Sequence, residues 1–301
     1  MKQGALRADL LLLLTAAIWG FAFVAQRVGM DYVGPYTYNA VRFAIGSLSL
    51  VPLILWNRTR QQQAYPEIPP GNARTVLVGG LIAGLALFAG SSLQQVGLVY
   101  TTAGNAGFIT GLYVVIVPLL GLLWKQYPST GTWIGAVLAA IGLYFLSVTN
   151  EFTISFGDFL IFLSAFFWAG HVLIIGWLSP KMDSLKLASV QFAICSLLSL
   201  AVAMSIETIE LTTIIQAAVP ILYGGLFSVG IAYTLQVVAQ RDAHPAHSAI
   251  ILSLEGVFAA IGGWLLLGEV LTMRGLFGCG LMLTGMVLSE MSGYLFKSKN
   301  I

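Results

Sequence analysis

The fifty residues from Thr75 to Trp124 contain no Asp, Glu, Lys or Arg. A single helix of this length would reach about 75 Å, whereas the hydrocarbon core of a bilayer is about 30 Å thick. A small polar cluster, YTTAGN at 100–105, divides the stretch into two apolar runs and is typical of a turn. The stretch therefore predicts two membrane-spanning helices joined by a short turn.

The composition of the whole chain agrees with a membrane protein. Hydrophobic residues make up 58% and charged residues 9% of the sequence, against about 25% charged residues in soluble domains. Apolar runs of about 20 residues predict an all-α polytopic membrane protein with about ten transmembrane helices. We place these helices at 9–29, 36–56, 75–97, 104–124, 131–149, 158–178, 186–205, 217–239, 247–267 and 274–296.

The charged residues between these helices predict the orientation of the chain. Lys and Arg gather in the connections on the side of the N-terminus, and they include Arg7, Arg58, Arg60, Arg74, Lys181, Lys186 and Arg241. The opposite connections hold Asp31, Glu151, Glu207 and Glu210. By the positive-inside rule both termini lie in the cytoplasm. We therefore expect an integral protein of the inner or plasma membrane that is surrounded by the lipid bilayer and has no nucleic-acid partner.

The two halves of the sequence resemble each other. DLLLLLTAAIWG from Asp9 aligns with DFLIFLSAFFWA from Asp158, and the same offset places Arg42 on Gln191. A slightly shorter offset matches Gly135 and Gly142 with Gly278 and Gly285. These matches predict two five-helix repeats, at 9–149 and 158–296. Because each repeat has an odd number of spans, the second is inverted, and such repeats commonly hold a substrate near the midplane where they meet.

Several of these residues carry a resemblance to a known family. They are Trp19, Trp168, Arg42 and the segments GFITGLYVVIVPLLGLLW, at 107–124, and SLEGVFAAIGGWLLLGEVLT, at 253–272. With them the chain resembles the EamA-type transporters of the drug/metabolite transporter superfamily. The resemblance implies a ten-helix transporter, often an exporter of amino acids or other small metabolites. Gly256 departs from the family pattern, which often has proline there, so a kink in the ninth helix is not assured.

Glu255 is the first candidate for a functional residue. It stands in an apolar run, about 12 Å from the start of its helix at 1.5 Å per residue. An acid near the centre of a membrane helix costs about 2.5–3.5 kcal/mol, so it should face the protein interior or a cavity. We interpret it either as a carboxylate that couples transport to protons or binds a substrate amine, or as a structural acid. Glu269 closes the same run, where we expect water to solvate its charge.

Arg42 and two tryptophans are further candidates. Arg42 either binds a substrate carboxylate or snorkels to the outer membrane interface, which is the favoured alternative. We expect no direct ion pair between Arg42 and Glu255, because their depths differ by roughly 10 Å. Trp19 and Trp168 lie in mid-helix rather than in an interfacial belt, which favours a cavity wall over ordinary packing.

Polar side chains in the predicted helices complete the candidate site. They are Gln94, Asn105, Tyr113, His171 and Gln236. A continuous helix would place Asn105 and Tyr113 on one face, because they are two intervals of four apart. These groups either line a cavity or form hydrogen bonds between helices. For His171, ordinary packing with a satisfied ring is the more typical role.

The sequence as a whole predicts a secondary transporter, an exporter of small metabolites such as amino acids or related amphipathic compounds, which works by alternating access. Its expected partners are a small-molecule substrate and, as coupling ion, protons. We expect no metal, no cofactor and no enzymatic activity, since no phosphate-binding loop or pair of nucleophile and base is recognisable. Two alternatives stay open: a membrane-embedded enzyme that modifies lipids or isoprenoids, and a non-transporting membrane scaffold.

Overall fold

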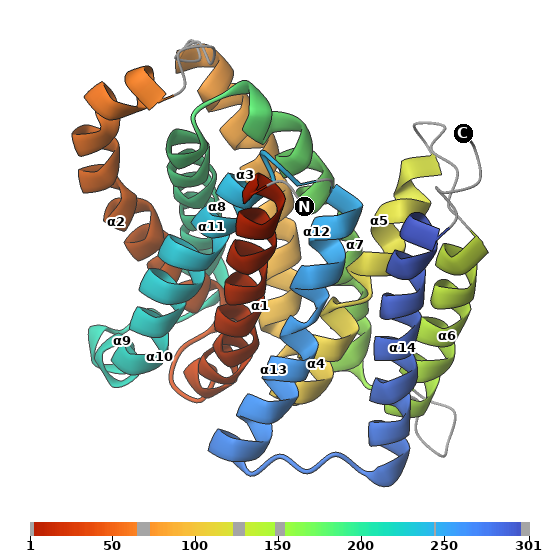
Figure 1. Cartoon of the computed structure of the whole chain (residues 1–301). Coiled ribbons are helices and arrows are strands. Elements are labelled where there is room, and N and C mark those ends of the chain that lie inside the picture. The colour runs from red at the N-terminus through yellow and green to blue at the C-terminus, as the bar shows by residue number, and fades with distance from the viewer. Residues whose placement is uncertain (1–2, 65–72, 123–129, 148–153, 244, 296–301) are drawn as a thin grey trace.

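The structure, a computed structural model, describes residues 3–64, 73–122, 130–147, 154–243 and 245–295, and most of them are helical (Figure 1). The helices of the first half are α1 (Gln3–Gly29), α2 (Pro35–Ala64), α3 (Ala73–Gly97), α4 (Ala103–Thr110), α5 (Tyr113–Gly121) and α6 (Thr130–Ser147). Those of the second half are α7 (Phe156–Leu178), the 3-10 turn η2 (Ser179–Lys181), α8 (Ser184–Ile206), α9 (Leu211–Gln216), α10 (Ala218–Leu222), the π-helical η3 (Tyr223–Tyr233), α11 (Thr234–Ala239), α12 (Pro245–Ser253), α13 (Glu255–Gly262), the π-helical η4 (Gly263–Leu267) and α14 (Met273–Leu295).

These elements confirm an all-helical membrane protein. Among the described residues, eight segments are long and apolar enough to cross a bilayer. They are Leu6–Gly29, Pro35–Trp56, Ala73–Gly97, Ala103–Gly121, Phe156–Lys181, Ser184–Ile206, Ala218–Ala239 and His247–Leu267. The apolar stretch in α6, Trp133–Leu146, is shorter, and α14 is a helix of 23 residues. Ten crossings therefore stay a prediction. The side of the membrane on which the termini lie stays a prediction as well, and residues 1–2 and 296–301 are outside the described part.

Helices of the first half pack against helices of the second in a regular pattern. α2 packs on α8, α4 on α13 and α6 on α14, while α1 packs on η3 and α3 on α7. The first span of one half corresponds to the first span of the other, and so on along the chain. When each span is replaced by its counterpart, the contacts α2–α8, α4–α13 and α6–α14 stay the same, and the contacts α1–η3 and α3–α7 exchange places. Figure 1 shows α6 and α14 side by side at one edge of the bundle. The arrangement is that expected of two equivalent units.

Glycines set the closeness of the α6–α14 contact. A Cβ atom on Gly278 would lie 2.6 Å from the Gly142 carbonyl oxygen, and one on Gly285 would lie 2.6 Å from that of Gly135. The repeat aligns Gly135 with Gly278 and Gly142 with Gly285. In space the pairing is crossed, because Gly278 lies against Gly142 and Gly285 against Gly135. Small residues allow helices in membranes to approach in this way, so the antiparallel pair has a local two-fold arrangement.

Two membrane segments are interrupted, one in each half. α4 ends at Thr110 and α5 begins at Tyr113, while α12 and α13 are separated by Leu254 alone. Around both points some backbone hydrogen bonds are of the 3-10 type, from residue i to residue i−3. The Leu112 amide donates to the Ile109 carbonyl, and the Val257 amide donates to the Leu254 carbonyl. Gly111, Leu112 and Leu254 keep right-handed helical dihedral angles, so each segment is tightened locally and not unwound.

Gly256 brings the two interrupted segments together. A Cβ atom there would lie 3.0 Å from the Gly107 carbonyl oxygen and 3.0 Å from the Phe108 Cα, so only glycine allows α4 and α13 to approach this closely. The ninth helix is thus interrupted without a proline. The break between α12 and α13 lies at Leu254, two residues before Gly256. Gly256 itself allows the close contact between α4 and α13.

Candidate functional site

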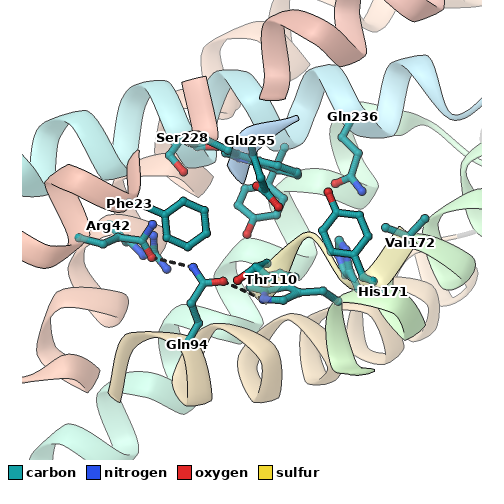
Figure 2. A pocket seen from close by; sticks show the side chains of 14 residues that line it. Phe23, Arg42, Gln94, Thr110, His171, Val172, Ser228, Gln236 and Glu255 are labelled. Carbon is teal, nitrogen blue, oxygen red and sulfur yellow. Dashed lines mark hydrogen bonds between the residues drawn. The ribbon is translucent and has the colours of Figure 1, made fainter. Parts of the chain in front are cut away.

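A cavity lies between the two halves, next to both helix interruptions (Figure 2). The predicted site residues that line it are Trp19, Arg42, Gln94, Tyr113, Trp168, His171, Gln236 and Glu255. Sequence reasoning missed Phe23, Gln26, Thr110, Val172, Ser228 and Tyr233, which line it as well. The free space is about 30 Å³, enough for one or two water molecules. Ligand pockets measure about 300–1,000 Å³, so the cavity is closed in this conformation.

Glu255 occupies the first position of α13, directly after the interruption at Leu254. Its side chain is 3% exposed. Tyr113, the first residue of α5, lines the same cavity, and its buried hydroxyl has no hydrogen-bond partner among the described residues. No Lys, Arg or His of the described chain forms an ion pair with Glu255. The two interruptions therefore bring a carboxyl and a phenol together in the protein interior, without a neighbouring cation.

Arg42 is buried in the cavity wall, with 1% of its surface exposed. The favoured expectation, that it snorkels to the membrane interface, is therefore wrong. Its Nε donates to the Asn39 Oδ1 at 2.9 Å, and its Cζ lies 4.8 Å from the centre of the Phe43 ring and 5.4 Å from that of Tyr38. Cation–π contacts of this kind and the amide hold the head group inside the protein. The Nη2 atom is buried and has no hydrogen-bond partner.

A chain of amide hydrogen bonds connects three helices across the two halves. The Trp168 Nε1–H donates to the Gln94 Oε1 at 2.8 Å, and the Gln94 Nε2 donates to the Gln26 Oε1 at 3.1 Å. The Gln26 Nε2 in turn donates to the Ala22 carbonyl of its own helix at 3.1 Å. The chain runs from α7 through α3 to α1. A lone amide near the end of the apolar run of α1 was the signal that could have identified Gln26.

Tyr233 joins the two tryptophans that the repeats have in common. Its ring centre lies 4.4 Å from that of Trp19 and 6.1 Å from that of Trp168. The Trp19 Nε1–H donates to the Ser228 carbonyl of the π-helical η3 at 3.2 Å. Equivalent tryptophans from the two halves thus form an aromatic wall around one tyrosine at the end of η3. A tyrosine among many in an apolar chain gives no sequence signal of this role.

His171 is held by a neighbour, as the packing interpretation expected. Its Nε2 lies 2.8 Å from the Gln191 Oε1, and the ring is 1% exposed. Other polar atoms of the wall keep unused capacity: the Thr110 hydroxyl and the Gln236 Oε1 are buried and without a partner among the described residues. The wall therefore offers hydrogen-bond donors and acceptors to whatever enters the cavity.

Asn105 does not line the cavity, contrary to the expectation that it shares a face with Tyr113. It lies in the first turn of α4, where its backbone amide donates to the Thr102 hydroxyl at 3.1 Å. Eight positions separate Asn105 from Tyr113, which is about 12 Å along a helix axis, so the two side chains lie at different depths. The structure brings together all the other predicted site residues.

A second, larger cavity, which we call the vestibule, opens at one end of the bundle and has a free volume of about 530 Å³. We call this end the Asp31 end, because Asp31 follows α1 there. The opposite end, with Asp9 near the start of α1, is the Asp9 end. The vestibule is lined by Arg27, Val28, Asp31, Val99, Tyr100, Thr101, Thr102, Leu267 and Glu269. Gln26 lines the central cavity and the next residue lines the vestibule, so the two spaces are neighbours along α1.

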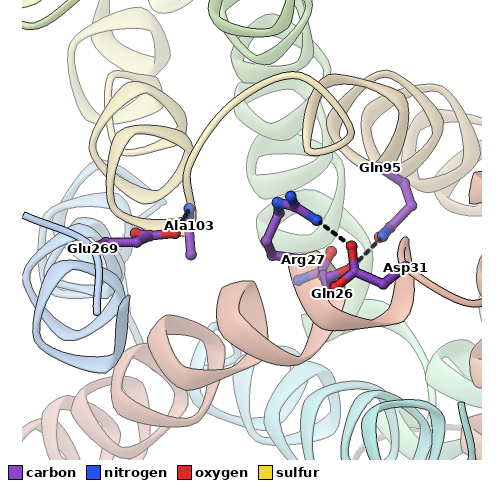
Figure 3. A network of polar contacts seen from close by, with 6 residues as sticks. All are labelled: Gln26, Arg27, Asp31, Gln95, Ala103 and Glu269. Atoms are coloured by element: carbon purple, nitrogen blue, oxygen red, sulfur yellow. Dashed lines mark hydrogen bonds and ion pairs between the residues drawn. The ribbon is translucent and has the colours of Figure 1, made fainter. Parts of the chain in front are cut away.

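Polar contacts shape the wall of the vestibule (Figure 3). The Arg27 Nη1 and the Asp31 Oδ1 form an ion pair at 2.9 Å, and the Gln95 Nε2 donates to the Gln26 carbonyl at 3.1 Å. Glu269 accepts bonds from the backbone amides of Ala103 and Gly104, at 2.8 and 3.0 Å. Glu269 lines the open vestibule, where water can solvate its charge as expected, and its carboxylate also caps α4, which the sequence did not indicate.

Comparisons with known proteins cover nearly the whole chain. The model of the EamA-like transporter family matches it twice, at residues 6–148 and 155–291. An uncharacterized transporter of Archaeoglobus fulgidus is 34% identical over 94% of this chain and 85% of that protein. The uncharacterized inner membrane transporter YedA of Escherichia coli K12 is 25% identical over 94% and 90%. A crystal structure matches with a TM-score of 0.71 and 15% identity, over 96% of this chain and 98% of the other; at this identity the match shows the fold alone.

Proposed function

Because the chain belongs to the EamA-like transporter family, and is thus a membrane transporter of small molecules, we propose that it is a secondary transporter that works by alternating access. Its moving parts are two inverted five-helix repeats, at 9–149 and 158–296, in an inner or plasma membrane with both termini in the cytoplasm. The contact pattern of the helices, which exchange of the halves leaves unchanged, supports the inverted repeats. Lys and Arg on the predicted cytoplasmic side support the orientation.

The observation that carries the proposal is the position of Glu255. It lies where two interrupted helices from different halves meet, in a buried cavity and without a cationic partner among the described residues. Rocking one half against the other around this point would expose the carboxyl to each side of the membrane in turn. A carboxyl that takes up a proton on one side and releases it on the other couples proton movement to transport.

The substrate that the cavity suits is a small amphipathic metabolite, of which amino acids are an example. Three aromatic rings, Trp19, Trp168 and Tyr233, offer an apolar wall, while Glu255, Gln236 and Thr110 offer polar groups. We propose export as the direction, with the vestibule at the Asp31 end outside the cell, as the charge distribution predicts. The vestibule adjoins the central cavity along α1, so an opening between the two spaces would give the released compound a path outward.

The other two functional classes receive less support. A membrane enzyme needs a cluster of acids or histidines near one membrane face, and the described residues contain no group of three or more His, Cys, Asp or Glu that could hold a metal. A scaffold does not require polar groups around a buried cavity. We therefore propose no catalytic role for the residues of the wall.

The test is transport across a range of pH in vesicles that contain the purified protein. The substrate is first identified by comparing metabolites inside and outside cells with and without the protein. Glu255→Gln keeps shape and hydrogen bonding but cannot titrate, so we expect it to fold and to lose pH-dependent transport, while Glu255→Asp retains part. Asp31→Asn is the matched control, because its carboxylate is 61% exposed and lies outside the central cavity.

Proton movement is followed in the same vesicles with an internal pH-sensitive dye. Substrate-driven proton flux should disappear in Glu255→Gln and persist in Asp31→Asn. If folded Glu255→Gln keeps the pH profile and the proton flux of the wild type, Glu255 is a structural acid and the coupling role is wrong.

A further inference from the structure

The guanidinium of Arg42 lies in the interior of a membrane protein without a counter-ion from the described chain. Its side chain is 1% exposed, and none of the ion pairs of the described residues includes it. Arginine stays protonated in proteins, so this charge cannot be removed by losing a proton. A buried charge without a neighbouring opposite charge is strongly unfavourable. The acid of the cavity wall, Glu255, forms no ion pair with Arg42, so an anion that enters the cavity would supply the missing counter-charge.

The surroundings of Arg42 leave one part of its head group available for such an anion. Asn39 accepts from the Nε, and the rings of Phe43 and Tyr38 lie beside the Cζ. The Nη2, by contrast, is buried without a partner in a residue that lines the central cavity. Guanidinium groups bind carboxylates with well-directed, charge-assisted hydrogen bonds. The neighbours thus fix the head group and leave a donor unused.

We propose that Arg42 is an anion-binding site in the central cavity, filled by the carboxylate of the transported compound or, in its absence, by a small inorganic anion. The inference rests on the proposed transport function for the first of these sources and deepens it, since it requires the substrate to carry an acidic group. In Figure 2, Phe23 lies between Arg42 and Glu255. The acidic end of a bound compound therefore points to α2, and its remaining part extends past Phe23 toward α13.

The second half offers no duplicate of this site. Gln191, which the repeat aligns with Arg42, is neutral, and its Oε1 lies 2.8 Å from the His171 Nε2. One chain therefore binds one anion, on the side of the first half. This asymmetry fixes which way round a compound with a single carboxylate lies in the cavity.

Binding is measured on the purified full-length protein in detergent, at fixed pH and without any gradient. The thermal midpoint of unfolding is followed while acetate, chloride or acetamide is added. We expect acetate or chloride to raise the midpoint in a saturable way, because a ligand of the folded state stabilises it, and acetamide, which lacks the charge, to have no such effect. The ratio of the half-saturating concentrations of acetate and chloride then distinguishes a carboxylate site from a site for inorganic anions.

Variants connect the effect to Arg42. Arg42→Gln should raise the half-saturating anion concentration at least tenfold, a loss of about 1.4 kcal/mol of binding free energy. Arg27→Gln is the matched control, because this arginine pairs with Asp31 in the vestibule and should leave anion binding unchanged. Asn39→Asp places a carboxylate beside the Arg42 Nε and should compete with the added anion. Arg42→Lys keeps the charge but not the fork, and should bind acetate more weakly than the wild type.

Two results would overturn the inference: no saturable difference between acetate or chloride and acetamide in the wild type, or unchanged anion binding in Arg42→Gln. If Arg42→Gln does not fold, Arg42→Lys and Asn39→Asp decide in its place, and wild-type affinity in both contradicts the site. Because no transport is measured, failure here leaves the pH test of Glu255 intact, and failure of the Glu255 test leaves anion binding intact.

Discussion

The two halves of the molecule share a backbone plan and differ in their chemistry. Asp9 and Asp158, which the repeat aligns, each contact the start of the interrupted segment in the other half: Asp9 pairs with His247 at 2.8 Å, and Asp158 accepts from the Thr101 hydroxyl. The charges of the cavity follow no such rule. Arg42 has the neutral Gln191 as its mate, and the glycine offset places Leu112 where the second half has Glu255. The scaffold is thus contributed twice and each cavity charge once.

This difference separates residues that make the fold from residues that make the site. Features that occur in both halves, such as the glycines of α6 and α14, the helix interruptions and the two tryptophans, hold the halves in register and form the wall. Features that occur in one half give the cavity its direction, with a cation on α2 and an acid on α13. Substitutions in the first group should lower stability, whereas those in the second should change function in a folded protein.

A large loss of stability is expected for Gly256→Ala at the α4–α13 crossing. The added Cβ meets backbone atoms of Gly107 and Phe108 at 3.0 Å, so α4 and α13 must separate by a few tenths of an ångström to accept it. Overpacking of this kind costs about 3 kcal/mol. Gly280→Ala in α14 is the control, because its Cβ would meet no atom within 4 Å. Gly256 occurs in one half only, since the glycine offset aligns it with Tyr113, so a large loss would sharpen the comparison by showing that a scaffold residue need not be duplicated. Equal thermal unfolding midpoints for the two variants would show that the crossing tolerates separation.

A smaller loss, about 2 kcal/mol, is expected for Glu269→Ala, which removes a charged cap from the start of α4. Glu207→Ala is the informative companion, because this acid caps α2 by accepting from the amides of Tyr36 and Thr37 at 2.9 and 2.7 Å. In both cases a carboxylate of the second half caps a helix of the first. Unfolding of the two variants and of the double variant is measured. A neutral effect of Glu269→Ala would mean that water replaces the carboxylate at the amides of Ala103 and Gly104.

Sequence reasoning identified much of this molecule, and its failures have physical causes. Apolar runs and internal matches are properties of single segments, so the membrane class and most cavity residues were predictable. Helical period indicates that two residues share a face but not that they lie at the same depth, which is why Asn105, about 12 Å along the helix from Tyr113, was placed wrongly. Arg42 was expected to reach water because the cation–π contacts with Phe43 and Tyr38 that keep it inside depend on side-chain directions. Tyr233 contributes through its position between two tryptophans, which only the packing of η3 defines.

The paired tryptophans sharpen the comparison between the halves at a level of about 1 kcal/mol. Trp168→Phe leaves the buried Gln94 Oε1 without its donor, which costs about 1 kcal/mol or more. Trp19→Phe leaves only the Ser228 carbonyl, which lies within a helical segment, so we expect a smaller effect. Both variants are compared by thermal unfolding and by transport. Equal losses would mean that the two tryptophans serve the same packing role, and that the amide chain through Gln94 adds nothing to stability.

The smallest effect is expected where the sequence and the structure disagree most clearly. Asn105→Ala removes an amide from the first turn of α4 but leaves the cap of that turn, which uses the Asn105 backbone and the Thr102 hydroxyl. Its side chain is absent from the cavity wall, so transport should equal that of the wild type, and stability should change by no more than about 0.5 kcal/mol. Gln94→Ala, an amide lost from the wall itself, is the matched contrast and should slow transport, since Trp168 and Gln26 both lose their partner. A transport defect in Asn105→Ala as large as that of Gln94→Ala would mean that the substrate contacts the start of α4, and the transport path would then have to include the Asp31 end of that helix.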